Sequence, residues 1–267
     1  MRAAVLRSGG LQVGTTADPA PGPGQVLVRT RMCGICASDL HTIEHGEILA
    51  TDPSGCFAYD TSRDLVLGHE YCAETVDHGP ETVRTLAVGT RVTSSPVVVT
   101  PAGPRAVGLC NEYPGGFGEL MVLDEALLHR VDDGLPDEHA ALVEPLSTGA
   151  FYVRRSAISG EEVPVVIGCG AIGLAVITSL RRAGVRPIVA ADFSVLRRDL
   201  AVAMGADVCE ERWDAEAERF WVARVSANTW RWIRTPDGWR IAARVNANLD
   251  GTPEHREMLA PRSPDPG

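Results

Sequence analysis

The 267-residue sequence contains no lysine, no tryptophan before residue 213 and no long uninterrupted apolar run. A membrane span needs roughly 18 to 20 apolar residues, and the N-terminus becomes polar too early for a signal peptide. We therefore expect a soluble, cytoplasmic protein with no membrane partner.

The Lys-plus-Arg count of 25 is entirely arginine, and 35 acidic residues bring the net charge to −10. This charge argues against nucleic acid as a partner.

Cysteine and tryptophan are both distributed unevenly. The seven cysteines are odd in number and scattered, which without a secretory signal is typical of reduced thiols and metal ligands rather than of a disulfide framework. All five tryptophans lie between residues 213 and 239. The last quarter of the chain therefore differs in composition from the rest, and the length allows two ordinary domains.

The pattern of apolar residues predicts three segments. Residues 1–150 contain short β-branched runs separated by Gly and Pro, which predicts a mainly β, barrel-like domain. In residues 151–209, strands over 163–167 and 186–191 alternate with helices reaching about 183 and 204, which predicts a parallel α/β unit.

The third segment, residues 210–267, begins with a charged stretch that predicts a helix over 210–219. A β-hairpin with its turn at 235–238 follows. Strict alternation in its second strand places four side chains on one face, namely Trp239, Ile241, Ala243 and Val245.

Candidate metal ligands are concentrated in the first domain. Cys33 and Cys36 are followed by Ser38, Asp39 and His41. Taken alone, the two thiols could be ordinary buried cysteines, and the β context makes a thioredoxin-like redox pair the weaker alternative.

Three further residues favour a metal site over these two interpretations of the thiols. His69 and Glu70 are adjacent, and Glu144 precedes a proline. One thiolate, one imidazole and one carboxylate form the mixed ligand set that leaves a zinc coordination position open. A single histidine or a Glu-Pro pair alone would not indicate a zinc site.

Four ordered segments, CGICASDLH, GHE, EPLSTG and GCGAIG, resemble the zinc-dependent medium-chain dehydrogenase/reductase family of alcohol and polyol dehydrogenases. The resemblance covers residues 1 to about 208. It implies a GroES-like barrel followed by a Rossmann domain, and hydride transfer between NAD and a small alcohol, aldehyde or ketone. Its implied zinc ligands are Cys36, His69 and Glu144.

The resemblance also implies roles for neighbouring residues. Glu70 would be a carboxylate able to approach the metal, and Asp39 would orient the His69 imidazole. Ser38 and His41 would relay the proton, Thr148 would lie against the nicotinamide, and Cys33 would be structural. The family's optional structural zinc needs four closely spaced cysteines, whereas the corresponding stretch here holds only Cys110. We therefore expect one catalytic zinc and no structural zinc, and a homo-oligomer is compatible with the family.

The cofactor segment places Gly168, Gly170, Ile172 and Gly173 between an apolar strand and a helix, with Asp192 closing the next strand. Glycines allow close approach of the pyrophosphate, the helix N-terminus binds it, and the acid accepts ribose hydroxyls. A glycine-rich turn used only for packing is the alternative. Because Asp192 would repel a 2′-phosphate, we expect NAD rather than NADP, although two arginines follow nearby.

The dinucleotide pattern breaks near Cys209. A complete domain of this type has two halves and classically six parallel strands. The sequence pattern predicts only two such strands before Cys209. The segment RTPDGWRIAARVNANLDGTPEHREML resembles the final hairpin of a nuclear-transport-factor-type domain, as in ring-hydroxylating dioxygenase β subunits and polyketide cyclase-like proteins.

The predicted architecture is therefore a GroES-like barrel, a truncated Rossmann-type unit and a hairpin of foreign type. The alternative for the hairpin is an unusual Rossmann edge. The alternative for the function is an inactive zinc-binding fragment or hybrid without dehydrogenase turnover.

Overall fold

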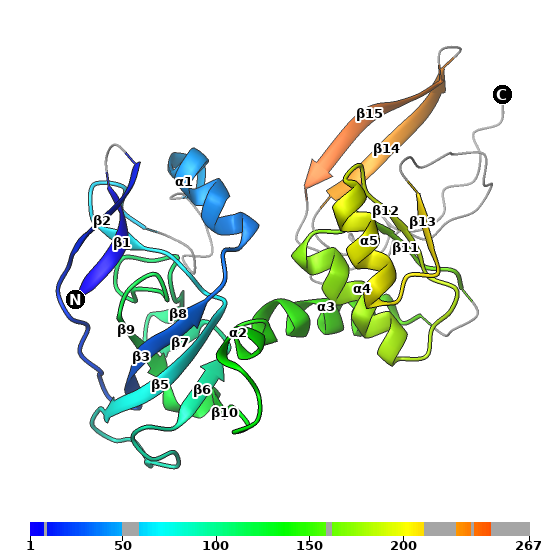
Figure 1. Cartoon of the computed structure of the whole chain (residues 1–267). Coiled ribbons are helices and arrows are strands. Elements are labelled where there is room, and N and C mark those ends of the chain that lie inside the picture. The colour runs from blue at the N-terminus through cyan, green and yellow to red at the C-terminus, as the bar shows by residue number, and fades with distance from the viewer. Residues whose placement is uncertain (8–9, 50–58, 159–161, 211–227, 236–237, 247–267) are drawn as a thin grey trace. The chain divides into compact units, whose positions relative to one another are not determined.

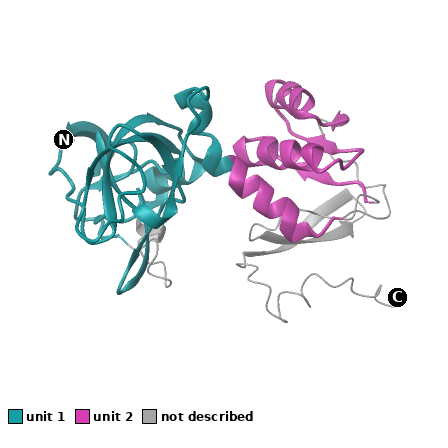
Figure 2. Cartoon of the chain, turned by 90° about the horizontal axis from the view of Figure 1, so that it is seen from below, with its two compact units in different colours: residues 1–145 teal, residues 146–267 magenta. Residues whose placement is uncertain are grey.

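The computed structural model describes residues 1–267 except 8–9, 50–58, 159–161, 211–227, 236–237 and 247–267. The chain divides into two compact units, residues 1–145 and 146–267 (Figure 2). This boundary falls close to the one predicted at residue 150. Among the described residues, no helix combines the length and apolar character that a membrane crossing requires.

Unit 1 is built mainly from antiparallel strands (Figure 1). Its sheets have the orders β2-β1-β4, β10-β6-β5-β3-β9 and β7-β8. The strand bounds are β1 Arg2–Arg7, β2 Gly10–Thr15, β3 Gln25–Cys33, β4 Leu65–Val66, β5 Tyr71–His78, β6 Arg91–Ser94, β7 Val97–Thr100, β8 Gly103–Ala106, β9 Leu120–Asp124 and β10 Leu128–Arg130. The predicted mainly β first domain is confirmed.

The core of unit 1 follows from alternation along its strands. Val26 and Val28 of β3 are fully buried, whereas Leu27 between them is half-buried, as expected for a strand with one face toward a core. Tyr71 at the start of β5 is also buried, and its hydroxyl lies 2.8 Å from Ser94 Oγ. That contact satisfies a polar group that would be costly to bury alone.

Three helical segments accompany these strands in the described part of unit 1, namely α1 Ala37–Leu49, the 3-10 turn η1 Glu125–Leu127 and α2 Asp137–Ala140. The helix α3 Val143–Ser156 begins in unit 1 and continues into unit 2. Asp137 at the start of α2 accepts from Arg91 Nη1 at 2.8 Å and from Arg31 Nε at 2.7 Å. These two charge-assisted contacts attach α2 to β6 and β3.

Unit 2 contains the predicted parallel α/β arrangement. Its strands and helices are β11 Val165–Ile167, α4 Ala171–Arg182, β12 Val189–Ala191, α5 Val195–Met204 and β13 Val208–Glu210. The strands pair in parallel in the order β11-β12-β13. β13 was not predicted, because three residues are too few to show a period.

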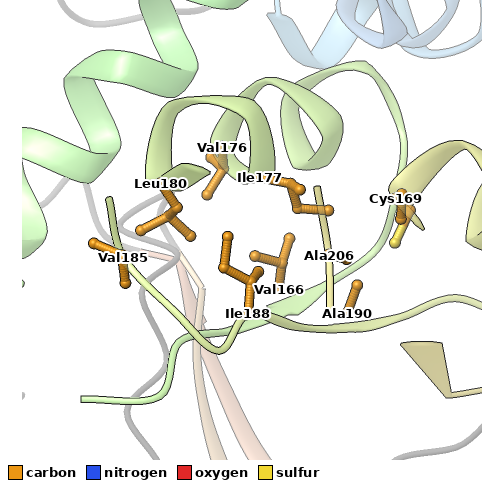
Figure 3. Close-up of a cluster of buried hydrophobic side chains, with 10 residues drawn as sticks. Val166, Cys169, Val176, Ile177, Leu180, Val185, Ile188, Ala190 and Ala206 are labelled. Atoms are coloured by element: carbon orange, nitrogen blue, oxygen red, sulfur yellow. The ribbon is translucent and has the colours of Figure 1, made fainter. Parts of the chain in front are cut away.

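The core of unit 2 lies between α4 and the strands (Figure 3). Ile177 and Leu180 of α4 and Ile188 beside β12 are fully buried. α5 has an N-cap at Ser194, whose Oγ accepts from Arg197 N, and a C-cap at Gly205 with φ of +115°, a conformation that glycine adopts without steric cost. These caps fix the helix that follows the candidate cofactor acid.

The C-terminal segment contains the predicted hairpin. β14 Asn228–Thr235 and β15 Gly238–Asn246 pair antiparallel, with Thr235 opposite Gly238. The helix predicted over 210–219 does not begin at Glu210, which ends β13. Its remaining residues, 211–219, and the packing of the Trp239 face lie outside the residues and side chains that the structure describes. The resemblance of this segment to a nuclear-transport-factor-type domain stays a prediction.

Candidate functional site

The structure brings together a thiol, an imidazole and a carboxylate in unit 1. Donor atoms of Cys36, His69 and Glu70 all lie within 4.8 Å of one another. Cys36 precedes α1, while His69 and Glu70 precede β5. His69 and Glu70 are buried, with 8 % and 4 % of their surfaces exposed.

Asp39 holds the two segments of this cluster in place. Its carboxylate is fully buried and accepts from the backbone N–H of Cys36 at 2.8 Å and of Gly68 at 3.3 Å. Asp39 Oδ1 also lies 3.5 Å from His69 Nδ1. No hydrogen bond joins the two groups among the described residues, so Asp39 acts on the imidazole mainly through its charge.

One polar atom of the cluster has no partner of its own. Glu70 Oε1 is buried and forms no hydrogen bond within the described part of the chain. Burial lowers the pKa of His69, but Asp39 and Cys36 outweigh this effect and raise it to about 10. The surroundings of His69 therefore favour positive charge.

The donor set fits zinc. Zinc accepts sulfur, nitrogen and oxygen ligands, and three protein ligands with one open position are typical of catalytic sites. The unsatisfied Glu70 oxygen supplies a buried ligand atom that has no other described partner.

Gly34 allows the Glu70 carboxylate to occupy this position. A Cβ at residue 34 would lie 2.5 Å from Glu70 Oε2. The Gly34 N–H also donates to the Glu70 carbonyl oxygen at 2.7 Å. The glycine of the CGIC segment therefore has a packing role that its spacing does not reveal.

Cys33 is not a member of the cluster among the described residues. Burial raises the pKa of its thiol to about 12, and its Sγ lies 3.4 Å from the Gly34 carbonyl oxygen. Cys33 is half-buried and packs against the core of unit 1, as a thiol acting as a small apolar group does.

Ser38 and His41 both lie on α1 but differ in environment. Ser38 Oγ lies 3.3 Å from His69 Nε2. His41 is exposed, and its spacing of three residues from Ser38 makes the two side chains helix neighbours. The structure thus places Ser38 at the cluster and His41 toward solvent.

Glu144 lies outside the group of converging ligand atoms found among the described residues. It occupies the first turn of α3. Burial raises the pKa of the Tyr71 hydroxyl, and the charges of Cys33 and Glu144 contribute to the rise.

We expect Asp39→Asn to weaken zinc binding about 10- to 100-fold, the usual cost of losing a group that orients a ligand. The amide retains one acceptor oxygen, whereas Asp39 uses both of its oxygens on Cys36 and Gly68. Competition with a chromogenic chelator would measure the affinity. An unchanged affinity in a folded variant would show that Asp39 does not position the ligands.

The glycine-rich turn of unit 2 has the geometry of a phosphate-binding loop. Gly168 follows β11 with φ of +89°, and Gly170 is the N-cap of α4 without a side-chain cap. A Cβ on either would meet nothing within 4 Å. The start of α4 is therefore open, and a helix N-terminus attracts anions.

Gly173 has a different role from the other two glycines. A Cβ there would collide with the Gly168 carbonyl oxygen, so residue 173 must be glycine for the turn to close against the helix. Ile172 is half-buried and packs against the core of unit 2.

Asp192 follows β12 and is bound to the glycine-rich turn. Its Oδ2 accepts from Cys169 N and its Oδ1 from Ser194 N, both at 2.8 Å. The Ser194 amide is the main cause of its lowered pKa. The carboxylate therefore stays ionised, and each oxygen retains a lone pair for a further donor.

Thr148 lies on α3 beside a close helix contact. A Cβ at Gly149 would lie 2.6 Å from the Ala175 carbonyl carbon, so α3 and α4 approach at backbone distance. Thr148 is half-buried there. Its predicted place against the nicotinamide stays a prediction.

Comparisons with known proteins identify dehydrogenases as similar proteins. Residues 22–133 match the alcohol dehydrogenase GroES-like domain. The chain is 35 % identical over 201 residues to (R,R)-butanediol dehydrogenase of Bacillus subtilis, covering 72 % of this chain and 58 % of that protein. It is 32 % identical over 219 residues to erythritol/L-threitol dehydrogenase of Mycolicibacterium smegmatis, covering 76 % and 60 %.

A solved structure extends the likeness to three dimensions. The crystal structure of 2R,3R-butanediol dehydrogenase from Bacillus subtilis superposes with a TM-score of 0.69 at 31 % identity, covering 80 % of this chain and 65 % of that chain. The chain spans 58 % and 60 % of the two curated relatives. In its mainly β unit, its parallel unit and these matches, the chain is similar to the zinc-type medium-chain alcohol and polyol dehydrogenases.

Proposed function

We propose that the chain is a zinc-dependent oxidoreductase that interconverts a small alcohol or polyol and its carbonyl form with NAD. The observation that carries this proposal is the convergence of Cys36, His69 and Glu70 with a buried, unpartnered carboxylate oxygen. Zinc at this place would supply Lewis-acid chemistry that lowers the pKa of a substrate hydroxyl.

The chain's own residues would hold the site and move the proton. Asp39 fixes the backbone on both sides of the cluster and directs His69. Ser38 Oγ lies 3.3 Å from His69 Nε2, at the edge of the cluster, and would take up the proton of a substrate hydroxyl bound there. His41, one helical turn further and exposed, would pass that proton to solvent.

The cofactor proposal rests on the glycine-rich turn. The open N-terminus of α4 would bind the pyrophosphate, and the free lone pairs of Asp192 would accept ribose hydroxyls. We propose NAD because the ionised Asp192 disfavours a 2′-phosphate, even though Arg197 Nη1 lies 3.7 Å from its Oδ2.

Which carboxylate completes the zinc site is a separate question. The motifs favour Glu144, whereas the ligand geometry favours Glu70. We propose that Glu70 coordinates directly and that Glu144 contributes less to zinc affinity.

We expect Glu70→Gln to lower zinc affinity by more than about tenfold, since an amide is a weaker zinc ligand than a carboxylate. Glu144→Gln should have a smaller effect, and Glu138→Gln, at an exposed acid of α2, should have none. Zinc titration and turnover of all three variants would be measured together. A larger loss in Glu144→Gln than in Glu70→Gln would restore Glu144 as the direct ligand.

A second candidate function is zinc binding without turnover. It is favoured by the sheet of unit 2, in which the described residues form three parallel strands, half of the six in a two-half dinucleotide fold. Such a chain would bind zinc and still form no NADH from any alcohol.

A further inference from the structure

The parallel sheet of unit 2 packs its two helices on one face. Val166 of β11 and Ala190 of β12 belong to the same core cluster as Ile177 of α4 and Ala201 of α5 (Figure 3). Successive side chains of a strand point to opposite faces of a sheet. The strand neighbours of Val166 and Ala190 therefore lie on the face away from both helices.

This second sheet face carries apolar residues from all three strands. Pairing places Val165, Val189 and Val208 side by side and Ile167 beside Ala191. Ile167 and Val208 are 52 % and 43 % exposed. Parallel sheets are normally covered on both faces, so a partly exposed apolar face of this kind marks a packing surface.

The chain that leaves this sheet supplies a segment able to cover it. β13 ends at Glu210, and residues 211–227 lead from it to the hairpin β14–β15. A two-stranded hairpin alone is only marginally stable in water. Because the hairpin is tethered to the sheet itself, its effective concentration at the second sheet face is high.

The backbone register of the hairpin gathers tryptophan positions on one face. Trp232 lies opposite Ile241, and residues two apart on a strand share a face, so Trp230 and Trp239 lie on the same face. The register shift after Arg231 moves the end of β15 to the other face. The alternation expected from the sequence therefore holds only for Trp239 and Ile241.

We propose that this tryptophan face of the hairpin packs on the second sheet face of the same chain. Both surfaces are apolar, and their contact removes both from water. The tether favours the chain's own hairpin over that of a second copy. The packing depends neither on zinc nor on the proposed oxidoreductase activity.

Tryptophan fluorescence of the full, zinc-loaded chain tests the proposal, because all five tryptophans lie between residues 213 and 239. At every protein concentration, emission should be blue-shifted from that of the urea-unfolded chain and weakly quenched by acrylamide. Ile167→Asp and Val208→Asp should shift emission toward that of the unfolded chain and increase quenching, since an unpaired charge resists burial.

Leu196→Asp on α5 and Val13→Asp on β2 are the matched controls. Both residues are apolar and exposed, at 68 % and 87 %, and lie off the second sheet face. Neither control should change the emission. Zinc content and circular dichroism would show that the variants are folded, and Ile167→Ser and Val208→Ser would replace charged variants that are not.

Three results would overturn the proposal. The first is tryptophans as accessible in the unmodified chain as in urea, a measurement that needs no variant. The second is equal shielding in the unmodified chain and in folded variants of both sheet residues. The third is shielding that appears only as the chain dimerises, because the occupant of the face would then be a second copy.

Discussion

Replacing Cys36 with serine is expected to remove most of the zinc from the protein. A hydroxyl is a far poorer zinc ligand than a thiolate, and Cys36 supplies the only sulfur among the three converging donors. Loss of a direct ligand should exceed the roughly 10- to 100-fold cost of losing an orienting group. Metal analysis after dialysis against a weak chelator would measure the loss.

Cys33→Ser is the matched control for this prediction. The Cys33 thiol is half-buried and lies 3.4 Å from the Gly34 carbonyl oxygen, and partial burial raises its pKa to about 12. The variant should therefore keep its zinc and lose only packing stability. If Cys33→Ser loses the metal and Cys36→Ser retains it, the two cysteines have been assigned the wrong roles.

Gly173→Ala is expected to disrupt the glycine-rich turn. The added Cβ would meet the Gly168 carbonyl oxygen and would lie 3.6 Å from Val166 Cγ1. Because both belong to the turn and its strand, relief requires a backbone shift. Overpacking of this kind costs about 1–3 kcal/mol, which urea unfolding would detect.

Gly170→Ala tests ligand binding at this turn without disturbing the fold of the turn. Its Cβ meets nothing within 4 Å and residue 170 has a negative φ, so stability should change little. The same methyl group would enter the open space before α4, so ADP-ribose binding by calorimetry should weaken. Full ADP-ribose affinity in Gly170→Ala would place the ligand elsewhere.

The sequence predicted the mainly β unit and the parallel unit because both depend on hydrophobic periodicity. Val26 and Val28 alternate with less buried residues, and Val166 is the buried middle residue of the short apolar strand β11. β13 was not predicted because the three residues Val208–Glu210 are too few to show a hydrophobic period. The strand is evident only from its parallel pairing with β12.

The site was predictable in its residue types but not in its final geometry. Motif order singled out Cys36, His69 and two carboxylates. Which carboxylate reaches the thiol depends on the backbone turn at Gly68, where φ is +99°, and on the space left by Gly34. Neither feature can be read from residue spacing.

Asp192 in unit 2 is a second residue whose type was predictable from the sequence but whose contacts were not. Its position after an apolar strand predicted a ribose acceptor. The hydrogen bond from Cys169 N to its carboxylate adds a second role, because it ties the acid to the phosphate-binding turn. Such a contact arises from the parallel pairing of β11 and β12, which brings the two strand ends together.

The most direct test of the proposed dehydrogenase activity is NADH formation by the zinc-loaded full chain across a panel of small alcohols and polyols. We expect turnover that is lost on zinc removal, restored by zinc and strongly reduced in Cys36→Ser. One equivalent of bound zinc with no NADH formed from any alcohol would contradict it, and would identify the chain as a zinc-binding protein without dehydrogenase activity.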